Sequence, residues 1–280
     1  MRSRVGLWGS TQKLGEANIN ETRQALPISA VLTRCQIDID TLSEPGGDRR
    51  GHHLEGIAVT VTETTDLAAQ PLSAAMRDGS RAEHEAAEGS SFMSELLAGR
   101  VAPEGYAAYL LRLRAVYEAL EQVGRERRDH DPLVAAVHDP ALERLALIDA
   151  DLDHWSPGGP RTTDSPAASA YVDRVRASAV WGGLYAAHHY TRYLGDLSGG
   201  QAIGRVLDRE FDLEGRGIAF YSFTEIPKPK PYKDGYRARL DALGTDPAET
   251  ARVVDEVKVA FNLNQALFAE LSAHLPAWRR

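Results

Sequence analysis

The sequence predicts an all-α protein built as a single multi-helix domain. Apolar residues recur at three- and four-residue intervals through most of the chain after Thr65, which is the period of amphipathic helices. A short β-type run at 57–62 has no second run to pair with, so no sheet is expected. The last apolar-periodic segment opens with Asp246, Pro247 and Glu249, a pattern typical of a helix N-terminus.

The chain divides into an N-terminal extension and a helical domain. Residues 1–66 carry scattered apolar residues and a Pro- and Gly-rich stretch, so we expect a disordered extension followed by a domain at 67–280. The adjacent His52 and His53 are interpreted as solvated loop residues rather than metal ligands. No apolar segment of the kind found in secretory signals follows the first arginines.

Composition narrows the class of partner. The net charge of −8 argues against nucleic acid, and no apolar run approaches the roughly 18 residues of a membrane span. Cys35 is the single cysteine, so neither an intrachain disulfide nor a cysteine-held metal cluster is expected. We therefore expect a cytoplasmic protein without a membrane span.

Helix boundaries follow from prolines, glycines and the apolar period. Pro71 and Pro103 suit the first turns of helices, and Gly99 suits a helix stop. Proline and glycine make 157–166 a loop, and three further prolines exclude a long helix over 215–231. Helices are thus expected at 68–89, 90–100, from Pro103 to beyond Leu120, at 140–153, 167–181, from Lys233 and from Asp246.

The first of these helices carries a possible ligand pair. His84 and Glu88 are four residues apart and therefore lie on one helical face. An imidazole that binds a metal usually has its second ring nitrogen held by an acceptor, which Glu88 could supply directly or through water. By itself, this spacing is more often an exposed helix pair.

A glycine-rich stretch, His188 to Arg205, is the most unusual part of the domain. Gly195 and Gly199 share one helical face, which lets the backbone come close to a flat partner, and Asp196 lies between them. On the glycines alone, a helix that ends at Gly199 and restarts is the simpler interpretation. His188 and His189 are expected to be structural, one packed between helices and one facing outward.

Basic and phenolic residues complete the pattern. Arg77 precedes His84, Tyr190 precedes the glycines, and Lys233 and Arg237 share a later helix face. One nitrogen ligand, one bare helix face and several cations are what a planar dianionic macrocycle needs for its two faces and its two carboxylates.

With these residues in view, the chain resembles the haem oxygenases, most closely the bacterial ones that extract iron from haem. The resemblance runs from about Thr65 to Leu275. Tyr-Leu-Gly-Asp-Leu-Ser-Gly-Gly-Gln at 193–201 resembles the family's distal-helix signature without a departure, and Ala-Glu-His-Glu-Ala-Ala-Glu at 82–88 resembles its proximal motif. The implied fold holds haem between a proximal and a distal helix.

The resemblance also implies residue roles. It places His84 as the axial iron ligand, with Glu88 as its hydrogen-bond partner. Arg77 stands where the family commonly has lysine, so charge alone is retained at that propionate contact. The remaining implied propionate partners are Tyr190, Lys233 and Arg237. Phe261 and Asn264 resemble family residues that line the pocket and its distal polar network.

The implied reaction converts haem, O₂ and external electrons to biliverdin, CO and Fe²⁺. Gly195 and Gly199 would crowd the iron and direct oxidation to the porphyrin edge, and Asp196 would hold a water chain for proton delivery. No phosphate-binding glycine loop follows a strand, so a ferredoxin or flavoprotein reductase is the implied electron donor.

Two alternatives remain open. A haem-binding or haem-trafficking protein of the same fold would not need the relay carboxylate Asp196. A haem-free relative could be a thiaminase-like hydrolase or a di-iron protein. The first needs a nucleophilic cysteine, but Cys35 lies in the extension. The second needs Glu-x-x-His pairs, which the histidines of the domain lack.

Overall fold

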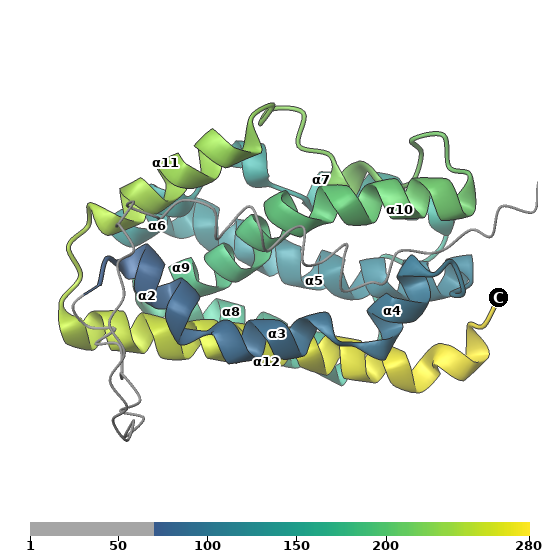
Figure 1. Cartoon of the computed structure of the whole chain (residues 1–280), viewed down its shortest axis with the longest axis horizontal. Helices are drawn as coiled ribbons and strands as arrows, with labels where there is room; N and C mark the ends of the chain where they lie inside the picture. Colours follow the sequence, from purple (N-terminus) through teal and green to yellow (C-terminus); the bar gives the residue numbers. More distant parts are fainter. Residues whose placement is uncertain (1–69) are drawn as a thin grey trace, which may run out of the picture.

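The computed structural model describes residues 70–280, and this part of the chain is helical almost throughout (Figure 1). The all-α prediction is confirmed; within the described residues an isolated bridge between Val101 and Arg279 is the one β-type pairing. The helices, in chain order, are α2 (Leu72–Gly79), α3 (Arg81–Glu88), α4 (Ser91–Leu97), α5 (Pro103–Arg127), α6 (Pro132–Val137), α7 (Leu145–Trp155), α8 (Pro166–Ala177), α9 (Gly182–His189), α10 (Gln201–Phe211), α11 (Pro229–Asp241) and α12 (Pro247–His274).

The predicted extension, with His52, His53 and the β-type run, lies outside the described residues. Within 70–280, no helix is both long and apolar enough to cross a membrane.

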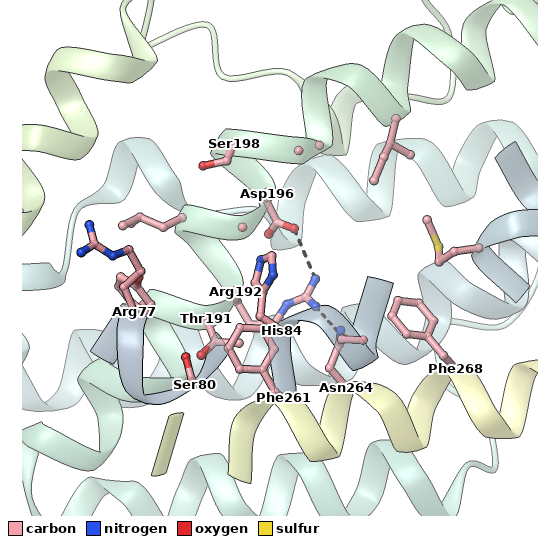
Figure 2. A pocket seen from close by; sticks show the side chains of 18 of the residues that line it. Arg77, Ser80, His84, Thr191, Arg192, Asp196, Ser198, Phe261, Asn264 and Phe268 are labelled. Atoms are coloured by element: carbon pink, nitrogen blue, oxygen red, sulfur yellow. Dashed lines mark hydrogen bonds and ion pairs between the residues drawn. The ribbon is translucent and has the colours of Figure 1, made fainter. Parts of the chain in front are cut away.

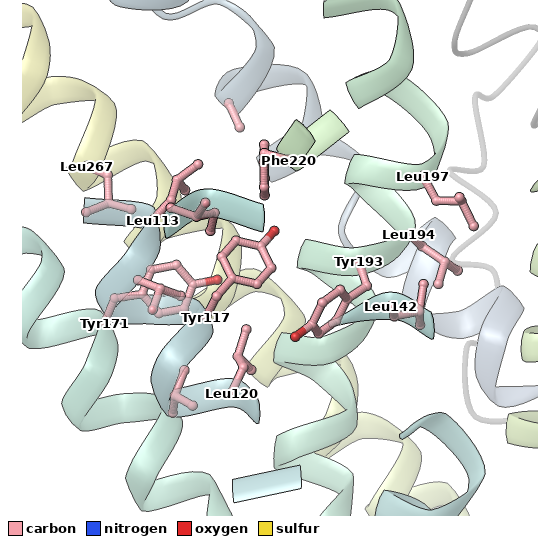
Figure 3. Packing of buried hydrophobic residues seen from close by; sticks show 14 of the residues in the cluster. Leu113, Tyr117, Leu120, Leu142, Tyr171, Tyr193, Leu194, Leu197, Phe220 and Leu267 are labelled. Atoms are coloured by element: carbon pink, nitrogen blue, oxygen red, sulfur yellow. The ribbon is translucent and has the colours of Figure 1, made fainter. Parts of the chain in front are cut away.

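Helix α5 forms the centre of the core. Its apolar stripe is buried against α7 and α8, and Leu110, Leu113 and Leu120 have no exposed surface. Figure 3 shows Tyr117 of the same helix among these side chains, facing Tyr171 and Tyr193. Each fully buried leucine contributes roughly 1.5–3 kcal/mol relative to an exposed one, so this stripe fixes the position of α5.

Helix α12 runs along most of the molecule (Figure 1) and contacts α2, α3, α4, α8 and α9. Its start has the predicted capping box: Asp246 accepts from the Glu249 amide, and Glu249 accepts from the Asp246 amide. This reciprocal pair satisfies two of the four amides that a helix N-terminus leaves unpaired.

Several boundaries differ from the prediction. The single helix expected at 68–89 is two helices, because Ser80 leaves helical geometry at φ −119° and ψ 15°, and its hydroxyl donates to the Met76 carbonyl. Helix α11 begins at Pro229, not Lys233, since a proline fits a first turn. The short helix α6 was not predicted; Asp131 caps it through the Leu133 amide.

The glycine-rich stretch neither ends nor restarts a helix. Between α9 and α10 the chain passes through two π-helical segments, η4 (Tyr190–Leu194) and η5 (Asp196–Gly200), with φ −60° at Gly195. The backbone therefore stays helical with a wider turn. Such π-segments are rare and frequently occur at functional sites.

His188 and His189 are both buried, so the expectation that one faces outward was wrong. The His188 ring has no exposed surface and lies 2.8 Å, Nε2 to Oε1, from Glu256 on α12. The His189 Nδ1 lies 2.9 Å from the Tyr236 hydroxyl, and burial lowers the pKa of His189 well below its ordinary value. Both histidines fasten α9 to its neighbours.

We predict that Glu256 stabilises the fold above mildly acidic pH. Burial opposes its ionisation, but hydrogen bonds from His188 and Arg174 prevail and lower the pKa of Glu256 from 4.5 to about 2. Because the folded-state pKa is the lower one, the contribution is present above pH 4.5 and is lost as pH falls toward 2.

Glu256→Gln should therefore lower the free energy of unfolding at pH 7 by about 1–3 kcal/mol. Denaturant titrations at several pH values measure this difference, which should shrink below pH 4.5. Glu104→Gln, on the exposed first turn of α5, is the matched control. A difference that stays constant down to pH 3 would contradict the assignment.

Candidate active site

A cavity opens between α3 and the π-helical stretch, with α12 along one side (Figure 2). It is lined by residues of α2 to α5, of the π-helical stretch, and of α10, α11 and α12. Nine of the eleven predicted site residues line it: Arg77, His84, Tyr190, Gly195, Asp196, Gly199, Arg237, Phe261 and Asn264. The sequence motifs therefore indicated residues that line one cavity. The lining itself assigns no role to any of them.

His84 stands on the α3 wall, half-buried, and Figure 2 shows its imidazole directed toward the segment that carries Asp196. The ring packs edge-on against Phe261 of α12 at a centroid distance of 5.4 Å and an interplanar angle of 79°. This contact orients the imidazole. Glu88 lies in the last turn of α3, and its side chain is outside the described part of the structure.

Gly195 and Gly199 form part of the opposite wall. Gly195 has ordinary helical dihedrals, and a Cβ atom built on it would meet nothing within 4 Å. No neighbouring group of the protein requires a glycine there. Its missing side chain leaves open space on the exposed side of the helix, so a flat ligand can lie directly against the backbone.

Asp196 belongs to a buried polar network in which the sequence analysis did not predict Tyr117 and Arg192. Tyr117 donates a short hydrogen bond to the carboxylate, and the Arg192 Nη2 lies 3.3 Å from its Oδ1. Arg192 also donates to the Tyr117 hydroxyl at 3.1 Å and to Asn264 Oδ1 at 2.8 Å. The network joins α5, the π-helical stretch and α12.

The network sets the ionisation of Asp196. Burial raises the pKa of Asp196, while the Arg192 charge and the hydrogen bond from Tyr117 act in the opposite direction. The Arg192 side chain is 7% exposed and balances the buried carboxylate. A carboxyl group whose pKa is raised toward neutrality is better matched to proton transfer than an ordinary one.

One clue to this network was in the sequence. Arg192 lies four residues before Asp196, which places it on the same helical face. Tyr117 fits the apolar stripe of α5, so its spacing does not separate a network member from a core residue.

The mouth of the cavity is cationic. Arg77 and Arg81 from the proximal side and Arg237 from α11 line it, next to Tyr190. Lys233 is not on the wall: it is buried, and its ammonium donates to Ser198 Oγ at 2.9 Å. Because Ser198 does line the cavity, the Lys233 charge lies one side chain away from it.

The far end of the cavity is apolar and aromatic, with Met93, Leu97, Ile203, Phe268, Tyr109 and Tyr221 on its surface. Tyr221 packs tightly on the bare face of α10, where a Cβ on Gly204 would lie 2.9 Å from the tyrosine Cβ. Among the described side chains of 70–280, no group of three His, Cys, Asp or Glu residues is placed to hold a metal ion.

These features define a class of protein: an all-α protein whose cavity, between an imidazole-bearing helix and a bare helix face, suits a flat, dianionic ring. A family model described as Heme oxygenase matches residues 70–270. The chain belongs to the heme oxygenase family, whose members degrade haem.

Relatives across the family agree. The chain is 36% identical to "Heme oxygenase 1" of Synechocystis over 207 residues, covering 73% of this chain and 86% of that protein. It is 37% identical to "Heme oxygenase 1" of Homo sapiens, with 74% and 73% covered. The crystal structure of Synechocystis heme oxygenase-1 in complex with heme superposes with a TM-score of 0.70 at 36% identity, covering 74% of this chain and 95% of that one.

We predict that Tyr117→Phe raises the pKa of Asp196 further, because it removes a hydrogen bond that favours the ionised carboxylate. It should also lower the free energy of unfolding by about 1–3 kcal/mol, since the carboxylate stays buried. Carbon-13 NMR of aspartate-labelled protein across pH measures the titration. Tyr171→Phe, whose buried hydroxyl lacks a partner among the described residues, should leave it unchanged. An unshifted Asp196 would disprove the coupling.

Proposed function

We propose that residues 67–280 form a biliverdin-producing haem oxygenase that releases iron from haem in the cytoplasm. The substrate is haem, and the reaction consumes O₂ and external electrons to give biliverdin, CO and Fe²⁺. The observation that carries this proposal is the pairing of His84 and the bare Gly195 backbone on opposite walls of one cavity, with a carboxylate network beside them.

The residues present fit haem. One imidazole is offered on one wall, which suits a single axial ligand. Open space over Gly195 suits a ring face held close to the backbone. Guanidinium groups lie at the mouth and apolar side chains at the far end, which matches the propionate and hydrocarbon edges of a porphyrin.

His84 would hold the iron of a bound haem, and the Gly195 backbone would lie against its ring. A neutral imidazole donates less electron density than a thiolate, so it gives little push toward O–O cleavage. The bound haem supplies the oxygen-activating iron and is itself the group that is oxidised. We assign Glu88 the role of holding the second nitrogen of His84.

Asp196 holds and moves protons at the distal wall. Tyr117 and Arg192 fix the carboxylate of Asp196. Its remaining lone pairs can then accept hydrogen bonds from water next to the Gly195 backbone. Asn264 holds the other end of Arg192, which fixes the guanidinium on the cavity wall. The chain thereby provides a fixed proton source, with Gly199 on the same wall.

The cationic mouth binds the two carboxylates of haem. Arg77, Tyr190 and Arg237 lie on the cavity surface and can contact them directly. Arg77 is half-exposed and bonded to Asp78, so its charge is already positioned by a neighbour. Lys233 acts one step away, because it holds Ser198 on the distal segment.

Electrons are supplied from outside the chain, and we propose a ferredoxin or a flavoprotein reductase as the donor. The sequence shows no phosphate-binding glycine loop after a strand, which a nicotinamide or flavin site of the common type needs.

The deciding experiment is a haemin titration of the full chain and of residues 67–280, followed by ascorbate or a reductase in air. A Soret band that forms and then decays into a biliverdin spectrum supports the proposal. A Soret band that survives reduction indicates a haem-binding protein instead, and no Soret band at all would reject both. Loss of binding in the shortened chain would show that the domain limits are wrong.

We predict that His84→Ala abolishes biliverdin formation and that added imidazole restores it, because the cavity then accepts a diffusible ligand. Biliverdin absorbance gives the rate, and electron paramagnetic resonance reports the loss and return of the nitrogen ligand. His154→Ala, on the exposed surface, is the control. Unchanged turnover in His84→Ala would mean that a different residue binds the iron.

We predict that Asp196→Asn keeps haemin affinity but lowers the biliverdin rate about 100-fold, the usual size of a lost acid–base group. The amide preserves the shape of the carboxylate and removes its proton exchange. Haemin titration and biliverdin yield separate the two effects. Asp255→Asn, an exposed residue of α12, serves as the control. Full biliverdin yield in Asp196→Asn would refute the relay role.

A further inference from the structure

A line of aromatic rings leads from the cavity to the protein surface. Tyr109 lies on the cavity wall, and its ring centroid is 6.2 Å from that of Tyr106. Tyr106 is fully buried and packs edge-on against Trp155, with centroids 4.8 Å apart. Trp155 is half-buried and contacts the exposed His154 at 5.4 Å. Each step is within the range of direct ring contact.

The surroundings of the Tyr106 hydroxyl determine whether this residue can remain oxidised. The Tyr106 hydroxyl is buried with the Tyr221 phenol beside it, and a neutral phenol is too weak a base to accept the proton of an oxidised Tyr106. Burial also raises the pKa of Tyr106 well above its ordinary value. A stable tyrosyl radical requires proton loss. The positive charge on an oxidised Tyr106 therefore passes on to the ring of Trp155.

Trp155 differs in both respects. Its indole is partly exposed, and its Nε1 donates to the Gly217 carbonyl at 2.6 Å. Gly217 allows this close approach, since a Cβ there would lie 2.6 Å from the indole nitrogen. An indole can be oxidised before it loses a proton, and part of this one is exposed. The line of rings therefore ends at Trp155, a side chain that can remain oxidised.

We propose that Tyr109, Tyr106 and Trp155 form a route that carries oxidising equivalents out of the haem cavity when hydrogen peroxide reacts there without productive turnover. Reduction of each peroxide to the oxidation level of water takes two electrons and two protons, and the protons come from solvent. The bound haem supplies one electron, and Trp155 supplies the other through the two tyrosine rings. The oxidised indole stays a radical cation, and its Nε1 proton stays hydrogen-bonded to the Gly217 carbonyl. This inference rests on the haem binding of the proposed function, not on biliverdin formation.

The test uses the full haemin-loaded chain, treated with hydrogen peroxide without reductant and frozen. Electron paramagnetic resonance with ring-deuterated tryptophan identifies a tryptophan radical, and peptide mass spectrometry locates added oxygen atoms. We expect the signal and the oxygen on Trp155. Trp155→Phe should remove both and increase oxidation of cavity residues. Soret titration beforehand separates failure of haem binding from failure of the route.

Two variants sharpen the result. Tyr106→Phe keeps the volume of this buried ring but is much harder to oxidise, so folding should be unaffected while Trp155 oxidation falls severalfold. Trp181→Phe is the control, since Trp181 is also half-buried but lies over Arg252 and away from this line. Unchanged Trp155 oxidation in Tyr106→Phe, equal oxidation of Trp181, or a radical confined to Tyr117 would each overturn the proposal.

Discussion

The structure depends on one constraint: a helix rich in glycine must stay continuous while its bare backbone faces a cavity. Each glycine in a helix costs about 1 kcal/mol relative to alanine, so the stretch is held by contacts on its other faces. His188 and His189 fasten the preceding turns to α12 and α11, and Arg192 ties the π-helical segment to α5. The buried side of this helix thus stabilises the open side.

The same contacts serve the chemistry. Arg192 is at once the counter-charge of Asp196 and a structural link between Tyr117 and Asn264. A buried carboxylate without such a partner would be strongly destabilising, and breaking a buried pair typically costs several kcal/mol. The Arg192 guanidinium therefore contributes both to the stability of the fold and to the ionisation of Asp196. A substitution of Arg192 would change both properties.

Much of the fold and site follows from local sequence rules. The capping box at Asp246 and the helix start at Pro103 are set by neighbouring residues, and they lie where predicted. His84 and Asp196 share a cavity as expected because their motifs are short and specific. The role of Tyr117, the burial of His188 and the position of Lys233 depend on helices far away in sequence. No spacing rule contains that information.

The break at Ser80 divides the proximal side into two eight-residue helices. Among the described side chains of α3, Ala87 alone is buried, whereas the distal wall is anchored through α5, α11 and α12. The two walls therefore differ greatly in the free energy needed to detach them, and short, weakly packed elements open first. Opening α3 alone therefore requires less free energy than opening the distal wall, while α2 stays held by its buried Met76 and by the bonds from Ser73 to Asp241.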